Sequence, residues 1–494
     1  MSEPVSLGLD LGTSELKAVL LDDAGTVLGH TGVALAISRP RDGWSEQEPE
    51  DWWRACGAAL QQLRRAHPTA YARIRCIGLS GQMHGAVLLD RQDRSIRPAI
   101  LWNDSRSSLE ATSLAQVHPS YPAIVGSLPM AGFTAPKLMW LKAHEPAAFD
   151  AVDCVMLPKD YLRLRFTGER ATEMSDAAGT LWLDVCSRRW FEPMIEATGL
   201  RRRQLPRLGE GSDPSGVVLA SIAGELGLSA GVVVAGGGAD NPASGVGIGA
   251  VNAGDAFISL GTSATVVAVT DKPVGNPAAG VHGLCHALPD RWYAMGVILS
   301  GATCLQWLTS LLSLPGEQAL LDRVSAQLPL DRPPPPHAPL FLPYLSGDRT
   351  PHNDPLARGG FMNLGIDTDV ASLGYAVLEG VGFALRDALT AVESTGAGVS
   401  KCALVGGGAR SDYWSQLLAD ILGLELHTLS GSELGASLGA AKLGFLALGH
   451  GRDLLQRGVS VKASFAADGA RHDALHARYQ KFRELYAAVH TLPR

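Results

Sequence analysis

Two tight turns along the chain combine glycine with hydroxyl side chains, a combination suited to binding phosphate. Gly12, Thr13 and Lys17 lie within six residues, and Gly261 and Thr262 belong to a second copy of the same Leu-Gly-Thr-Ser sequence. Backbone N–H groups in a glycine turn, aided by hydroxyls and a cation, hold phosphate oxygens. Two such turns that face each other across a cleft would hold a triphosphate from both sides. Neither matches Gly-x-x-x-x-Gly-Lys-Ser/Thr, so a Walker-type P-loop is excluded.

Two carboxylates stand where they would serve such a site. Asp10 directly precedes the first turn. It would repel a phosphate unless a cation lay between them, so we predict that it holds Mg²⁺, directly or through water. Asp240 is the only ionisable residue between positions 231 and 254, and it follows an apolar strand and three glycines. A carboxylate is costly there unless it is used, so Asp240 is predicted to be a general base, with Asn241 beside it. For both acids the alternative is a structural turn residue.

A third glycine run and a polar cluster complete the candidate residues. Gly408 ends the run Gly-Gly-Gly before an apolar helical pattern, which suits either an adenosine contact or a tight packing turn. His84 lies between Met83 and Gly85, and is expected to donate a hydrogen bond to a sugar oxygen if it binds a ligand. Residues 245–250 match a dinucleotide fingerprint only loosely and lack its acidic partner, so an oxidoreductase is a weakly supported alternative.

The elements around these residues predict an α/β protein built from two similar halves. Apolar strands flank the first turn at residues 5–9 and 16–21, and flank the second at residues 256–258 and 266–269. Apolar residues at steps of three and four predict a helix over residues 370–392. A chain of 494 residues is too long for one ordinary core. We therefore expect two domains, at residues 1–250 and 251–494.

Composition narrows the class of protein. A net charge of −7 argues against a general nucleic-acid binder. Seven cysteines without a Cys-x-x-Cys pair suit a reducing cytoplasm, and the N-terminus shows no signal-peptide pattern. Residues 231–254 are apolar but contain eight glycines, Pro242 and Asp240, so we interpret them as a strand followed by a ligand loop, and we expect no membrane segment.

At this point the chain resembles the FGGY family of carbohydrate kinases, and within it the bacterial xylulokinases. The similarity covers nearly the whole chain. It is carried by residues 10–14 (Asp-Leu-Gly-Thr-Ser), 81–85 (Gly-Gln-Met-His-Gly), 101–104 (Leu-Trp-Asn-Asp), 157–163 (Leu-Pro-Lys-Asp-Tyr-Leu-Arg), 174–184 (Met-Ser-Asp-Ala-Ala-Gly-Thr-Leu-Trp-Leu-Asp), 240–241 (Asp-Asn), 341–352 (Phe-Leu-Pro-Tyr-Leu-Ser-Gly-Asp-Arg-Thr-Pro-His) and 406–410 (Gly-Gly-Gly-Ala-Arg).

The resemblance implies a fold and a set of roles. It implies two actin-like, ribonuclease-H-like domains that close over ATP and a sugar, and it suggests a homodimer. It implies Asp240 as catalytic base and Asp10 as the acid on the magnesium side. The other implied roles are sugar contacts for Met83, His84 and Asn241, phosphate contacts for Thr13, Lys17, Gly261 and Thr262, and adenosine contacts for Gly408 and Asp412.

The same resemblance favours D-xylulose as substrate. The sequence Gln-Met-His-Gly is similar to xylulokinases, whereas glycerol kinases carry Arg-Glu at the matching positions. Glu15 and Glu433 depart from the pattern of that branch, and Glu433 is expected to affect ATP affinity more than sugar choice. The alternatives are a kinase of the same family for another pentulose, polyol or sugar acid, and a non-catalytic regulator that responds to sugar or ATP.

Overall fold

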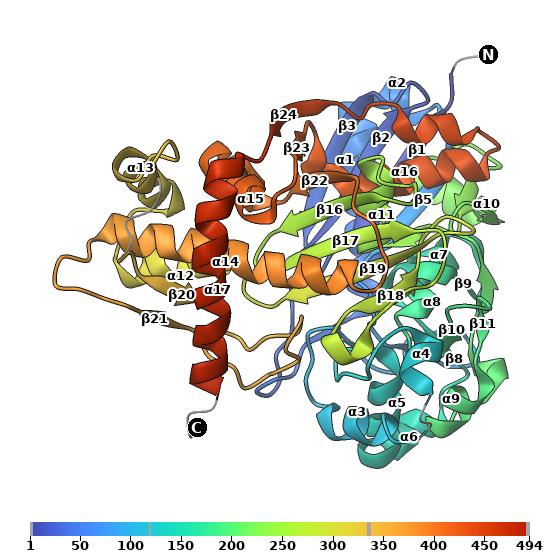
Figure 1. Cartoon of the computed structure of the whole chain (residues 1–494). Coiled ribbons are helices and arrows are strands. Elements are labelled where there is room, and N and C mark those ends of the chain that lie inside the picture. The colour runs from blue at the N-terminus through green and yellow to red at the C-terminus, as the bar shows by residue number, and fades with distance from the viewer. Residues whose placement is uncertain (1–2, 118–119, 333–336, 491–494) are drawn as a thin grey trace.

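Each half of the chain is centred on a seven-stranded sheet (Figure 1). The computed structural model describes residues 3–117, 120–332 and 337–490. The first sheet contains β1 (Val5–Leu11), β2 (Glu15–Asp22), β3 (Val27–Ala34), β5 (Ile74–Gly81), β13 (Pro214–Val217), β14 (Val233–Ala235) and β15 (Gly238–Ala239). The second contains β16 (Asp255–Leu260), β17 (Ala264–Thr270), β18 (His282–Cys285), β19 (Trp292–Ile298), β22 (Lys401–Val405), β23 (Leu426–Leu429) and β24 (Val461–Phe465).

The two sheets share one strand plan. The first runs β13-β14-β5-β1-β2-β3, and the second runs β24-β23-β22-β16-β17-β19 with β18 added at the edge. In both, the strand before the glycine turn pairs antiparallel with the strand after it, and parallel with a strand on its other side. The predicted α/β class and the predicted repeat of one plan are confirmed. Both glycine turns lie where that plan places them, between the first two strands of a sheet.

Helices cover the sheets and build a smaller lobe below the first one (Figure 1). The predicted helix at 370–392 is confirmed as α14 (Val370–Glu393), and the pattern after the third glycine run forms α15 (Asp412–Leu422). The remaining helices are α1 (Pro49–Ala66), α2 (Pro68–Tyr71), α3 (Ser108–Leu114), α4 (Tyr121–Val125), α5 (Thr134–His144), α6 (Pro146–Asp150), α7 (Pro158–Thr167), α8 (Met174–Ala178), α9 (Glu192–Ala197), α10 (Ala220–Leu226), α11 (Asp240–Gly247), α12 (Thr303–Leu311), α13 (Glu317–Gln327), α16 (Gly435–Ala447) and α17 (Gly469–His490).

Helix α16 joins the halves, because it comes from the second half of the chain and packs on β1 and β5 of the first sheet and on α11. Glycines make this approach close enough. A Cβ at Gly78 of β5 would lie 1.6 Å from the Ala440 carbonyl oxygen, and a Cβ at Gly439 would lie 1.7 Å from the Ala243 carbonyl oxygen. Any side chain at either position would therefore push the helix away from its neighbours.

A shared apolar cluster lies between the halves. Met83 and Ala239 from the first half pack in it with Phe257, Tyr293 and Met295 from the second. Among the residues that the model describes, no helix is long and apolar enough to cross a membrane. The apolar stretch 231–254 instead forms two short strands and α11.

The close contact of α16 gives a test of this packing. We expect Gly439→Ala to destabilise the protein by about 3 kcal/mol or more, because its methyl group would overlap the backbone of α11. The matched control is Gly57→Ala in α1, where an added Cβ meets nothing within 4 Å. That change should raise stability by about 0.5–1 kcal/mol. Calorimetric Tm values of both variants check this, and equal shifts would contradict the packing described for α16.

Candidate active site

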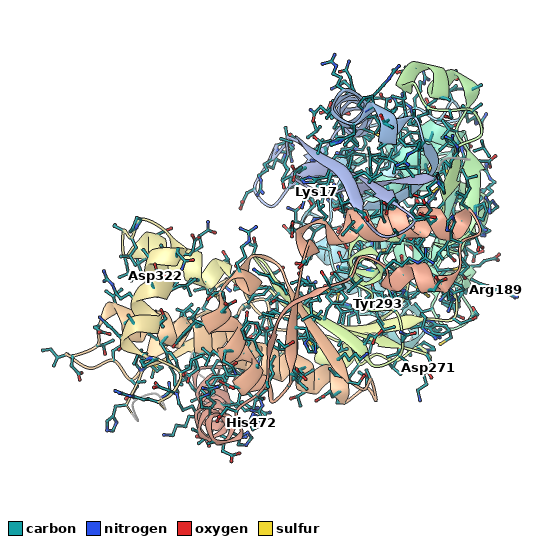
Figure 2. All side chains as sticks on the ribbon, turned by 90° about the horizontal axis from the view of Figure 1, so that it is seen from above. Lys17, Arg189, Asp271, Tyr293, Asp322 and His472 are labelled. Carbon is teal, nitrogen blue, oxygen red and sulfur yellow. The ribbon has the colours of Figure 1, made fainter. Side chains whose placement is uncertain are left out.

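A cavity of about 990 Å³ lies between the two halves. Asp10, Gly12 and Lys17 line it from the first turn, and Asp240 and Asn241 line it from the start of α11. The second half contributes the other wall, with residues that include Gly406, Gly407, Arg410, Ser430, Glu433 and Lys462. Lys17 reaches across, and its Nζ donates to the Glu433 carbonyl oxygen at 3.2 Å. In Figure 2 Lys17 lies on the side of the first half that is turned toward the second.

A second cavity of about 550 Å³ adjoins the first, since Gly407 and Arg410 line both. Gly261 and Thr262 of the second glycine turn line it, together with Gly408 and Trp414. The structure thus brings the two predicted phosphate turns and the third glycine run to one continuous region.

Burial controls the charge of the two predicted acids. Burial raises the pKa of Asp10 from 3.8 to about 6, although Lys17 opposes this. Burial, together with the negative charge of Asp10, raises the pKa of Asp240 to about 7. Asp10 Oδ1 has no hydrogen-bond partner in the described part of the chain. Lys17 lines the same cavity and lowers the pKa of Asp10, but burial outweighs it.

Asp240 is held by the helix that it begins. Its Oδ1 accepts hydrogen bonds from the backbone N–H of Asn241 at 2.7 Å and from Asn241 Nδ2 at 3.0 Å. The ligand loop expected after the strand is therefore short, and Asp240 is the first residue of α11. Both hydrogen bonds from Asn241 thus go to the same carboxylate oxygen.

Thr13 is tied to its own half and does not line either cavity. Its Oγ1 donates to Gln82 Oε1 and accepts from Trp102 Nε1, both at 3.0 Å. Gln82 Nε2 in turn donates to Gln47 Oε1 at 3.0 Å. Trp102 is 47% exposed, which is unusual for a large aromatic side chain. The motifs 81–85 and 101–104 contain Gln82 and Trp102, but they did not predict that these side chains contact Thr13.

Met83 and His84 lie outside the lining of both cavities, on the side of the first half. His84 adopts a left-handed backbone with φ of 67°, and its carbonyl oxygen accepts from Lys137 Nζ at 2.8 Å and Thr134 Oγ1 at 3.1 Å. Burial lowers the pKa of His84 to about 3, so the ring is neutral. Its Nδ1 donates to the Gly179 carbonyl oxygen at 2.7 Å. Nε2 is then an acceptor, whereas the sequence had led us to expect a donor.

Comparison with known proteins decides the family. Models of the N-terminal and C-terminal domains of the FGGY family of carbohydrate kinases match residues 5–247 and 256–448. The chain belongs to the FGGY family of carbohydrate kinases.

Several named relatives support this assignment. Xylulose kinase of Escherichia coli K12 is 46% identical over 482 residues, which cover 97% of this chain and 98% of the relative. Xylulose kinase of Klebsiella pneumoniae is 44% identical over 485 residues, or 98% of each chain. A crystal structure described as a xyloylose kinase from Brucella ovis has a TM-score of 0.95 at 44% identity and covers 99% of this chain and 100% of the other. The chain is therefore a carbohydrate kinase with the two-domain fold of its family.

The FGGY kinase has cavity residues that the sequence did not single out. Arg410 follows the third glycine run and lines both cavities, and Lys462 of β24 lines the larger one. Arg410 could have been found from its place in the Gly-Gly-Gly-Ala-Arg motif, whereas Lys462 lies in no motif. Asp412, a predicted adenosine contact, is exposed at the start of α15 and lines neither cavity. The roles given to single residues stay predictions.

The raised pKa of Asp240 predicts a pH-dependent cost in stability. In the unfolded kinase its carboxyl ionises near pH 4, whereas the folded protein keeps the proton up to about pH 7. The wild type therefore loses stability as the pH rises through this window. Asp240→Asn, which keeps the size and the Oδ1 acceptor, should be more stable than wild type at pH 8 by on the order of 2–4 kcal/mol, and nearly equal to it at pH 4.

Calorimetric Tm values at pH 4, 6 and 8 measure this difference. Asp271→Asn, at an exposed position after β17, is the matched control and should show little change at any pH. A difference between wild type and Asp240→Asn that does not grow with pH would rule out the ionisation described for Asp240.

Proposed function

We propose that this chain transfers the γ-phosphoryl group of ATP to D-xylulose, with D-xylulose 5-phosphate and ADP as products. One observation carries the chemistry: Asp240, a partly buried carboxylate with a pKa near neutrality, lines the same cavity as Gly12 and Lys17 of the first turn. The choice of sugar is supported by the printed names of relatives that are 44–46% identical to the chain.

Asp240 acts as the general base in this proposal. The terminal hydroxyl of the sugar donates to Oδ2 of Asp240, and the proton moves to that oxygen as the hydroxyl oxygen attacks the γ-phosphorus and the bond to ADP breaks. A base with a pKa near the working pH is both ionised in part and basic enough to accept a proton. Phosphoryl transfer has a loose transition state, so orienting the hydroxyl in line with the γ-phosphate supplies most of the acceleration.

ATP extends from the first turn into the adjoining cavity. Lys17 and Arg410 place positive charge where the phosphates lie, and the backbone around Gly261 and Gly408 approaches closely for lack of side chains. Met83 and the neutral ring of His84 contact the sugar from the first half. Nε2 of His84 accepts a hydrogen bond from a sugar hydroxyl, since Nδ1 is held by Gly179.

The residues around Asp10 fit a Mg²⁺ ion. The described residues contain no group of three or more ligating side chains, yet Mg²⁺ in phosphate sites needs only one or two carboxylates beside waters and phosphate oxygens. Asp10 Oδ1 is buried without a partner and the nearby acid Asp240 adds to the local negative charge, so a cation suits this place. When bound, Mg²⁺ offsets charge on the β- and γ-phosphates. Asp10 would hold it, directly or through water.

The cellular setting is part of the proposal. We infer a cytoplasmic location, which is supported by seven free cysteines, six of them buried. A small-molecule sugar is the substrate, and no partner of nucleic acid or membrane is proposed. A homodimer stays a prediction that light scattering on the purified protein would test.

Sugar-dependent ADP release with Mg·ATP tests the proposal. Over a panel of ketopentoses, polyols and sugar acids, we expect the highest kcat/KM for D-xylulose. Asp240→Ala should lower kcat by at least about 10² to 10⁴-fold, because general-base catalysis is worth that much. Greater turnover of another sugar would overturn the substrate but keep the base. Near-normal kcat in Asp240→Ala would overturn the base.

A further inference from the structure

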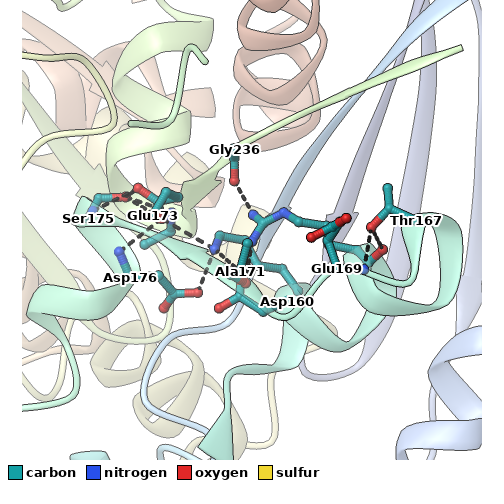
Figure 3. A network of polar contacts seen from close by, with 11 residues as sticks. Asp160, Thr167, Glu169, Ala171, Glu173, Ser175, Asp176 and Gly236 are labelled. Atoms are coloured by element: carbon teal, nitrogen blue, oxygen red, sulfur yellow. Dashed lines mark hydrogen bonds and ion pairs between the residues drawn. The ribbon is translucent and has the colours of Figure 1, made fainter. Parts of the chain in front are cut away.

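Five charged side chains lie buried beside the segment that leads to Asp240 (Figure 3). Lys159 Nζ lies 2.8 Å from Asp160, 3.3 Å from Glu173 and 3.0 Å from Asp176, and Arg163 Nη1 lies 2.8 Å from Asp160. All five side chains are 0% exposed. We call these residues of α7, α8 and the strand between them the buried charge cluster.

A buried cluster of charges is weak evidence for a gain in the stability of a fold. Apolar side chains of similar volume often stabilise a core as well as buried ion pairs do, because each ion must be taken out of water. Burial raises the pKa of Asp176 to about 8, although Lys159 opposes this. The cluster therefore keeps its acids close together at a cost that Lys159 and Arg163 offset only in part.

Two hydrogen bonds connect Arg163 and Ser175 to residues 236–239, the segment just before Asp240. Arg163 Nη2 donates to the carbonyl oxygen of Gly236. Ser175 Oγ accepts from the backbone N–H of Ala239 at 3.0 Å and donates to the Glu173 carboxylate at 2.8–2.9 Å. Gly236 and Ala239 are the two ends of this four-residue segment. Arg163 of the cluster therefore holds one end of the segment, and Ser175, which is hydrogen-bonded to Glu173 of the cluster, holds the other.

This segment needs support from outside. Residues 236–238 are glycines, and Gly237 has a left-handed φ of 79°. Glycine offers no side chain to pack and leaves the backbone free to adopt many conformations. On one side, Gly238 and Ala239 pair with Ser80 and Gly81 of β5. The backbone N–H of Ala239, the residue before Asp240, also donates a hydrogen bond to Ser175 Oγ.

We propose that Ser175 is a positioning residue for Asp240, supported by Glu173 and the rest of the buried charge cluster. It fixes the Ala239 amide, and through it the direction in which the Asp240 carboxylate enters the cavity. This inference rests on the proposed role of Asp240 as base. A shift of the base by about 1 Å can cost on the order of 10²-fold in rate, so a single hydrogen bond at this point matters.

Ser175→Ala tests the inference. The change removes one oxygen and leaves the charges in place, so the protein should fold. We expect kcat with D-xylulose to fall about 10- to 100-fold, while KM for the sugar stays within about threefold, because Met83 and His84 are untouched. The matched control is Ser6→Ala. Ser6 is buried at the far end of β1 from Asp10, and its hydroxyl donates to the Ala441 carbonyl oxygen at 2.7 Å. This control should lower Tm but keep kcat.

Ser175→Cys, of similar size but a weaker acceptor, should lie between wild type and Ser175→Ala, and it replaces the alanine variant if that one does not fold. A wild-type kcat in these variants, beside an inactive Asp240→Ala, would overturn the positioning role alone. So would a fall in kcat matched by an equal loss of folded protein. Wild-type protein that turns over another sugar but not D-xylulose would overturn the proposed substrate alone, and the variants would then be compared with that sugar. Wild-type protein that turns over no sugar of the panel would overturn the proposed function, and the positioning role with it.

Discussion

The rest of this structure depends on two partly buried carboxylates that line one cavity. Asp10 and Asp240 both lie in a place that favours their protonated forms, and the charge of one raises the pKa of the other. Such groups are stable in a fold only if other parts of the protein hold them there. The cations that surround them, Lys17, Arg410 and Lys462, line the same cavity from both halves. An anionic ligand that brings its own cation completes the balance of charge.

Buried polar side chains hold the helix that carries Asp240 at both ends. Just before its start, Arg163 contacts Gly236, and Ser175, which is hydrogen-bonded to Glu173, contacts Ala239. At its end, Lys442 of α16 donates from Nζ to the Gly247 carbonyl oxygen at 3.0 Å and is itself 2% exposed. A cation at a helix C-terminus satisfies carbonyl groups that have no partner within the helix. Because α16 packs on both α11 and the first sheet, it connects the helix that begins at Asp240 to the strand that ends beside Asp10.

Local patterns in the sequence predicted those turns, strands and helices that depend on residues adjacent in the chain. The glycine turns, the strands around them and helix α14 follow from apolar spacing and from glycine, and the structure has them at those positions. Contacts between distant residues could not be predicted this way. Ser175 and Ala239 are 64 residues apart, and Trp102 and Thr13 are 89 apart. Nor does the small, apolar surface of α16 indicate which sheet it packs on, because glycine and alanine fit any close approach.

The chemistry expected of Asp240 depends on opposing effects, of which those that raise its pKa prevail. Burial and the charge of Asp10 raise its pKa, while the hydrogen bonds from Asn241 lower it. Its place at the first position of α11 also favours the ionised form, since the N-terminus of a helix carries partial positive charge. The result is a pKa of about 7 rather than the ordinary 3.8. A carboxylate with the ordinary value would be a poor base toward an alcohol, and one far above 7 would be protonated before the sugar arrived. The glycine segment, Asn241 and the buried neighbours act together to keep Asp240 between these limits.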